Sequence, residues 1–281
     1  MEIKPSASWK GLAGKLRGGV SVFIGMSDAG KTTLIRYLAE RLLSMGEPLA
    51  LVDSDIGQSS VGPPGTVSMR TFARPGDLGR LGPARMVFVG TTNPARNIPA
   101  VVEAARRMVE AAKEAGAGTI LVDTTGLVQG GLGKALKLAK IRAIGPEAVV
   151  ALERERGELE HIVSRLEGVR VYRLRASRHA RRRTAPERKI NRAARLEGYL
   201  GRSRMLKLKT GRPEFLSVRG ERVDLDSLEQ GTVVALNREE ETLALGVYMG
   251  REGRRALIRT PLHDARGLRR VIIGEMKLDY A

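Results

Sequence analysis

The stretch Gly25–Thr33 has the sequence GMSDAGKTT and fits the pattern GxxxxGK[ST] in full. An apolar run, GVSVFI over Gly19–Ile24, stands directly before it, and a helical pattern over Lys31–Ser44 follows it. In a strand–turn–helix context of this kind, the glycines let backbone N–H groups face phosphate oxygens, and the helix N-terminus adds a partial positive charge. The stretch therefore predicts a phosphate-binding loop, or P-loop, of the NTPase type.

The motif assigns roles to its own side chains. Lys31 should reach the β- and γ-phosphates, and Thr32 should place its hydroxyl on Mg²⁺. No N/T-K-x-D motif follows late in the chain, and the nearest candidate, ALER at 151–154, does not fit, so ATP·Mg²⁺ is expected rather than GTP. The expected nucleotide-binding residues are Gly25, Met26, Ser27, Asp28, Ala29, Gly30, Lys31, Thr32 and Thr33.

Repeated strand and helix patterns continue along the first two thirds of the chain. Near-continuous Val/Ile/Leu strands between helices predict an α/β fold with a parallel sheet flanked by helices on both faces. The further strands are expected at Leu49–Asp53, Arg85–Gly90, Thr119–Asp123, Ala148–Leu152 and Val169–Leu174, and the further helices at Ile98–Ala115, Leu132–Ile144, Glu158–Leu166 and 183–200.

After Gly201 the sequence changes character, with short strand-like runs between turns rich in glycine and charge. Such spacing predicts a small antiparallel β module. The expected organisation is an N-terminal extension (1–18), a P-loop domain (19–201) with an arginine lid at about 178–200, and a small β-rich C-terminal domain (202–281).

Composition excludes several classes of site. The 281 residues contain no cysteine, which rules out disulfides, cysteine nucleophiles and Cys-ligated zinc, and three scattered histidines argue against catalytic zinc. No apolar run approaches the roughly 20 residues of a membrane span, and the N-terminus lacks the apolar core of a signal peptide. A cytoplasmic protein without a membrane partner is expected.

Most of the formal net charge of +18 is concentrated in one segment of the chain. Residues 170–207 hold fourteen Lys or Arg and two Glu, a net charge of +12. A basic patch of this density attracts polyanions such as nucleic acid, although an arginine-rich solvated face would have the same composition.

Three aspartates lie at the ends of two predicted strands: Asp53 and Asp55 in LALVDSD, and Asp123 in TILVD. The carboxyl ends of strands in such a sheet meet beside the phosphates. A carboxylate there can hold Mg²⁺ or accept a proton from an attacking hydroxyl, and the alternative for each is a structural cap on the next loop. The residues alone do not choose between Asp53 and Asp123 for the metal.

The segment 183–200 opens with a capping-box pattern, Thr184-Ala-Pro-Glu187, which predicts a helix. Arg188, Arg192 and Arg195 stand at i, i+4 and i+7 and share one face. Such a helix could lie over the nucleotide with its arginines inward, or it could contact only RNA phosphate or the ribosome. The opposing apolar strip is predicted to comprise Ile190, Ala193, Leu196 and Leu200.

Together these segments resemble the polynucleotide 5′-hydroxyl kinases of pre-mRNA cleavage, tRNA splicing and ribosomal RNA processing, in their short archaeal form. The likeness covers roughly residues 18–201. It is carried, in the family's order, by Gly25–Thr33, by DSDIGQSSVGPPGT (Asp53–Thr66), by GTTNPARN (Gly90–Asn97), by DTTGLVQGGLG (Asp123–Gly133), and by the arginine segment from Arg183 to Arg192.

The resemblance implies an enzyme that transfers the γ-phosphate of ATP to the 5′-hydroxyl end of RNA or DNA, with Mg²⁺ and an RNA-processing protein as a further partner. It implies that Asp55 is the general base and that Arg183 and Arg188 clamp the phosphates. Asp53 would help hold Mg²⁺ with Thr32. Gln58 and Arg192 would contact the substrate.

Two departures stand against the family pattern. Leu127 occupies the position at which eukaryotic members carry a tryptophan that contacts the RNA end, and the N-terminal β domain of larger relatives is not expected ahead of Gly19. The rival hypotheses are an ATP-binding scaffold of an RNA-processing complex without catalysis, and a P-loop NTPase of the metal-insertase or switch class.

Overall fold

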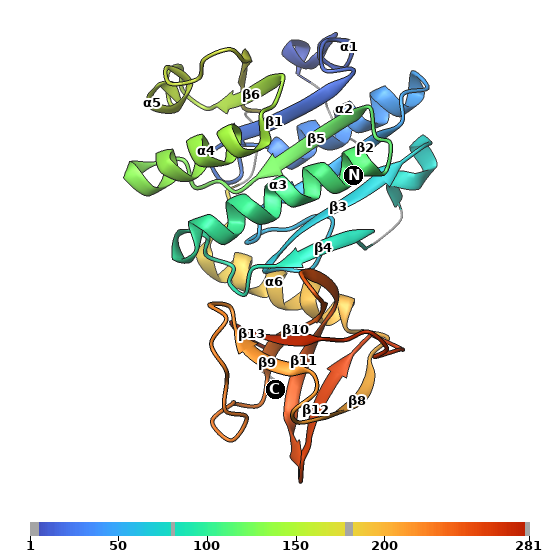
Figure 1. Ribbon diagram of the computed structural model, residues 1–281. Coiled ribbons are helices and arrows are strands. Elements are labelled where there is room, and N and C mark those ends of the chain that lie inside the picture. Colours follow the sequence, from blue (N-terminus) through green and yellow to red (C-terminus); the bar gives the residue numbers. More distant parts are fainter. Residues whose placement is uncertain (1–5, 80–81, 178–181, 279–281) are drawn as a thin grey trace.

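A seven-stranded sheet forms the upper part of the molecule in Figure 1, with strand order β4-β3-β2-β5-β1-β6-β7. The structure is a computed structural model that describes residues 6–79, 82–177 and 182–278. The strands are β1 (Gly19–Gly25), β2 (Leu49–Ser54), β3 (Thr66–Phe72), β4 (Arg85–Phe88), β5 (Thr119–Thr124), β6 (Ala148–Glu153) and β7 (Arg170–Arg175).

Helices cover both faces of this sheet. They are α1 (Leu12–Lys15), α2 (Lys31–Ser44), α3 (Ile98–Glu114), α4 (Gly130–Ile144), α5 (Glu160–Val163) and α6 (Ala185–Tyr199), with short 3₁₀ turns η1 (Ala7–Trp9), η2 (Pro75–Gly79) and η3 (Pro94–Arg96). One face buries Val101 and Leu136 from α3 and α4, and the other buries Leu34 and Leu38 from α2 beside Trp9. Residues before β1 thus contribute to the core.

The parallel sheet predicted from the sequence is confirmed across β2, β5, β1, β6 and β7. At one edge β3 and β4 run antiparallel, β3 against β2 and β4 against β3. The predicted strand at Arg85–Gly90 is β4, and β3 was not predicted. Its sequence, TVSMRTF, alternates polar and apolar residues, as expected of a strand near a sheet edge.

A second sheet follows, with strand order β8-β12-β11-β10-β13-β9. Its strands are β8 (Arg204–Lys209), β9 (Glu214–Ser217), β10 (Thr232–Arg238), β11 (Glu241–Glu252), β12 (Arg255–Thr260) and β13 (Arg270–Lys277). The pairs are antiparallel except β13 with β9. The β-rich C-terminal part expected from the sequence is therefore present, with β8 as a strand that was not predicted.

Helix α6 lies between the two sheets (Figure 1). Leu196 and Leu200 are buried in a cluster with Val233 and Leu245 of the second sheet and Phe88 of the first. The Tyr199 hydroxyl accepts a hydrogen bond from the β11 backbone at 3.1 Å. The second sheet therefore supports the C-terminal half of α6.

The start of α6 is fixed by the predicted capping box. The Thr184 hydroxyl accepts from the Glu187 backbone N–H, and the Glu187 carboxylate accepts from the Thr184 N–H at 2.7 Å. The predicted apolar strip is wrong at Ile190, which is 67% exposed. Only the C-terminal half of the helix packs on a sheet, and the N-terminal half extends towards the P-loop.

In the part of the chain that the structure describes, no helix is both long and apolar enough to cross a membrane.

Candidate functional site

The P-loop connects β1 to α2 as the motif predicted. Asp28 and Gly30 adopt left-handed backbone conformations, with φ of 58° and 96°. Lys31 begins α2, is buried, and donates from Nζ to the carbonyls of Gly25 and Met26 at 3.0 Å each. The lysine thus lies along the inside of the loop, at the N-terminus of a fourteen-residue helix.

A glycine of the loop after β5 lies against the P-loop. A Cβ atom added at Gly126 would overlap the backbone N, Cα and Oγ of Ser27. Only a residue without a side chain allows this approach, which brings the DTTG segment beside the phosphate-binding backbone.

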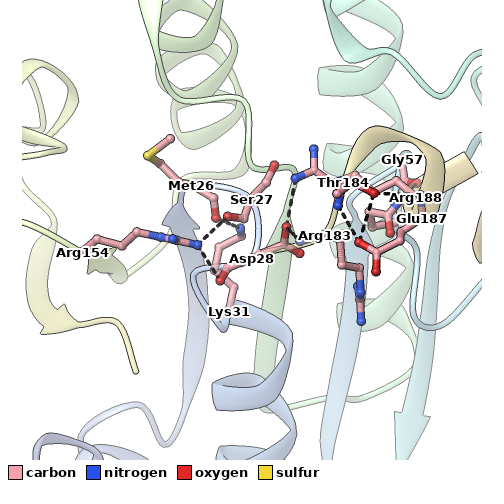
Figure 2. Close-up of polar contacts among 11 residues, drawn as sticks. Met26, Ser27, Asp28, Lys31, Gly57, Arg154, Arg183, Thr184, Glu187 and Arg188 are labelled. Atoms are coloured by element: carbon pink, nitrogen blue, oxygen red, sulfur yellow. Dashed lines mark hydrogen bonds and ion pairs between the residues drawn. The ribbon is translucent and has the colours of Figure 1, made fainter. Parts of the chain in front are cut away.

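Arg154, at the end of β6, contacts the P-loop from the other side. Its guanidinium donates to the carbonyls of Ser27 and Asp28, at 3.2 and 2.9 Å. Figure 2 shows it opposite the lid arginines. Arg154 was not predicted as a site residue, because ALER at 151–154 matches no nucleotide-binding motif.

The N-terminal end of α6 docks on the P-loop through one carboxylate (Figure 2). Asp28 Oδ2 accepts from the Arg183 backbone N–H at 3.0 Å and from the Arg188 guanidinium at 2.9 Å. Partial burial favours the neutral acid, but these hydrogen bonds and the two positive charges outweigh it and hold the pKa of Asp28 below its usual value. The lid is thus tied to the nucleotide loop.

Asp123, at the end of β5, lies beside the first turn of α2. Its Oδ2 accepts from the Thr32 hydroxyl at 2.6 Å. Burial, together with repulsion from Asp53 and Asp55, raises the pKa of Asp123 to about 7, while the charge of Lys31 opposes the shift. Thr32 and Asp123 form a pair of hard oxygen donors, the chemistry that Mg²⁺ prefers.

Asp53 is buried and organises the loop after β2. Oδ1 accepts from the Asp55 N–H, and Oδ2 accepts from the hydroxyls of Ser59 and Ser60 and from the backbone N–H groups of Ser60 and Val61. Burial raises the pKa of Asp53, and so does the negative charge of Asp55. The backbone N–H donors act in the opposite direction but do not outweigh burial. With both oxygens used by the loop, Asp53 is less available to a metal than Asp123.

Asp55 and Gln58 lie on the same loop and are half-buried. Asp55 Oδ1 accepts from the backbone N–H groups of Gly57 and Gln58, at 3.2 and 3.1 Å. Among the described residues Oδ2 accepts no hydrogen bond, so it can take a proton. The Gln58 side chain donates to the Gly57 carbonyl at 2.7 Å.

The structure brings Arg183 and Arg188 to the P-loop but not the rest of the predicted arginine face. Arg192 is half-buried and Arg195 is exposed, and neither makes an ion pair within the described ranges. Since α6 leaves the P-loop after its first turns, these two arginines lie further along the helix towards the second sheet.

Comparison with known proteins gives a consistent picture. The family described as "mRNA cleavage and polyadenylation factor CLP1 P-loop" matches residues 25–202. The chain is 36% identical over 187 residues to a polyribonucleotide 5′-hydroxyl-kinase of Methanocaldococcus jannaschii, covering 66% of this chain and 51% of that protein. A protein of the same name from Pyrococcus horikoshii is 37% identical over 186 residues, covering 66% and 50%.

The fold also occurs in a solved structure, that of the wild-type Clp1p–Pcf11p complex. The similarity has a TM-score of 0.78 at 13% identity and covers 98% of this chain and 80% of that one. The chain spans about half the length of the curated relatives it matches. Because the family match includes the P-loop, the acidic strand ends and the lid helix, the resemblance seen in the sequence is confirmed: the chain belongs to the CLP1 P-loop family.

Proposed function

We propose that this protein is an ATP-dependent polynucleotide 5′-hydroxyl kinase that phosphorylates the 5′ end of RNA, or of DNA. The observation that carries the proposal is the contact between Arg188 and Asp28, which joins an arginine-rich helix to the P-loop across 160 positions of sequence. Phosphoryl transfer is accelerated mainly by positioning and by cations around the migrating group, and this contact supplies both.

In the proposed reaction, the 5′-hydroxyl oxygen attacks the γ-phosphorus of ATP while Asp55 accepts its proton. The bond from the γ-phosphorus to the bridging oxygen breaks, and ADP leaves. Lys31 and the N-terminus of α2 neutralise the phosphates, and Arg183 and Arg188 stabilise the transferring group. Arg154 keeps the P-loop backbone in shape through its two carbonyl contacts.

Mg²⁺, when bound, would neutralise charge that develops on the β- and γ-phosphate oxygens. Thr32 and Asp123 fit this ion because a hydroxyl and a carboxylate lie within 2.6 Å of each other at the loop. We assign the metal to this pair rather than to Asp53, whose oxygens hold the Ser59–Val61 turn.

The nucleic acid strand is proposed to follow the basic segment 170–207, with Gln58 nearest its 5′ end and Arg192 contacting the strand further along. Arg175, Arg192 and Arg195 support this because each keeps its charge free of an ion pair within the described ranges. The RNA-processing protein partner stays a prediction.

The test is transfer of label from γ-labelled ATP to matched 5′-OH RNA and DNA oligonucleotides. We expect transfer by the wild type, transfer lowered by at least 100-fold in Asp55→Asn with unchanged ATP affinity, and no change in the control Asp226→Asn, an exposed acid of the loop before β10 that pairs with Arg251. ATP hydrolysis without transfer would favour a nucleotide switch, and binding without either would favour a scaffold.

A further inference from the structure

Helix α4 carries two lysines, Lys137 and Lys140, that are completely buried. They stand at i and i+3 and therefore point from the same face of the helix into the protein. A buried ammonium is costly unless it has hydrogen bonds and a counter-charge, and removing one partner of a buried charged network leaves the other uncompensated. Neither lysine takes part in the proposed reaction itself.

Lys140 contacts the end of β2. Its Nζ donates to Ser54 Oγ at 2.9 Å and lies 3.3 Å from the Ser54 carbonyl. Ser54 stands between Asp53 and Asp55, and its hydroxyl donates to the Asp123 carbonyl at 2.7 Å. Lys140 therefore joins the ends of the two strands that carry all three carboxylates.

Lys137 contacts the end of β5 in the same manner. Its Nζ donates to Thr124 Oγ1 at 3.0 Å and to the Thr125 carbonyl. The Thr124 hydroxyl donates in turn to the Phe23 carbonyl of β1 at 2.6 Å. Lys137 thus fixes the backbone that follows Asp123 to the strand that leads into the P-loop.

The charges around the two lysines point in the same direction. Burial lowers the pKa of Lys140 to about 8 against the attraction of Asp55, Asp53 and Asp123, with Asp55 the strongest of the three. Burial also lowers the pKa of Lys137, and repulsion from Lys140 and Lys31 adds to this. Both lysines thus lie within electrostatic reach of Asp55 and Asp123, and Lys140 is attracted most strongly by Asp55.

We propose that Lys137 and Lys140 are positioning residues for phosphoryl transfer: they supply the buried positive charge that lets Asp53, Asp55 and Asp123 share one site, and they hold the ends of β2 and β5 in register. The kinetic part of this inference rests on the proposed function. The electrostatic coupling between the lysines and the carboxylates does not depend on that function.

A double-mutant cycle on unfolding tests the pairing without any activity assay. Lys140→Met, Asp55→Asn and the double variant are compared with the wild type by urea denaturation. If the lysine acts through the carboxylate, Asp55→Asn offsets part of the stability lost in Lys140→Met. The change in the unfolding equilibrium constant of the double variant then differs by at least fivefold from the product of the changes in the two single variants. Deviation within about twofold is additivity and overturns the proposal.

The matched control is Arg142→Met, which removes one positive charge from the exposed side of α4 and should give an additive cycle with Asp55→Asn. If Lys140→Met does not fold alone, Lys140→Gln replaces it, because glutamine keeps a donor for Ser54 and still removes the charge. A parallel cycle pairs Lys137→Met with Asp123→Asn.

The kinetic readout separates positioning from stability. Lys140→Met should lower kcat for label transfer by about 100-fold while the KM for ATP changes little, because a displaced base costs rate and not binding. An unchanged kcat overturns the positioning role. If the wild type transfers no phosphate, the proposed function fails, and the unfolding cycle still decides the charge pairing.

Discussion

Removing the carboxylate of Asp28 should release the lid helix from the P-loop. Hydrogen bonds to charged groups contribute about 1.5–3 kcal/mol each, and the lower value applies because the Arg188 side chain is 33% exposed. Asp28→Gly removes both bonds without strain at φ 58°, so the docked lid should lose about 3 kcal/mol, roughly 100-fold in its equilibrium. Asp28→Asn keeps a neutral acceptor whose hydrogen bonds are about half as strong, so the equilibrium for the docked lid should fall by roughly tenfold.

The assay is the rate of tryptic cleavage after Arg183 and Arg188 in the folded protein. When opening is fast, this rate follows the population of the open lid. We expect the cleavage rate to increase in the order wild type, Asp28→Asn, Asp28→Gly. Asp226→Asn is the control and should be cleaved at the wild-type rate. Equal cleavage rates in all four proteins would show that the Asp28 contact does not hold the lid.

Three other perturbations follow from the geometry. Gly126→Ala should push its Cβ into Ser27 and weaken ATP binding by more than tenfold in calorimetry, whereas Gly131→Ala, with open space around it, should not. Because the folded pKa of Asp123 is raised to about 7, the folded state binds the extra proton, so the free energy of unfolding should fall as pH rises from about 4 to 7 and then level off. In urea titrations with chelator present, Asp123→Asn should remove this dependence of the free energy of unfolding on pH. If the dependence persists in the variant, Asp123 is not the group that takes up the proton. Tyr199→Phe should cost about 1–3 kcal/mol in the same titrations by leaving a β11 N–H unsatisfied, and an unchanged midpoint would show that the bond is not needed.

The sequence predicted the parts of the fold that local patterns determine. The strand–loop–helix unit around Lys31 and the capping box at Thr184 are encoded within a few residues, and both are present. Strand β3 was missed because TVSMRTF contains no continuous apolar run of the kind that marks the parallel strands, and it pairs antiparallel with β2 and β4. Its existence depends on partners that are distant in sequence.

The site shows the same division. Motif and resemblance identified the P-loop and suggested roles for Asp55, Arg183 and Arg188. Arg154, Lys137 and Lys140 were not identified, because an arginine that binds carbonyls and lysines that are fully buried have the same sequence pattern as residues on a solvated helix or loop. Only the contacts of α4 with the ends of β2 and β5, and of Arg154 with the P-loop, reveal them.

The apolar cluster around Leu196 and Leu200 has a consequence for how the chain can be divided. A fragment ending at Gly201 would lose Val233, Leu245 and the rest of the second sheet from this cluster, and water would reach the underside of α6. We expect such a truncated protein to bind a dye for exposed hydrophobic surface and to lose order in the lid, even though all its P-loop residues are intact. The P-loop part and the β-rich part of the chain would therefore have to be expressed and engineered together.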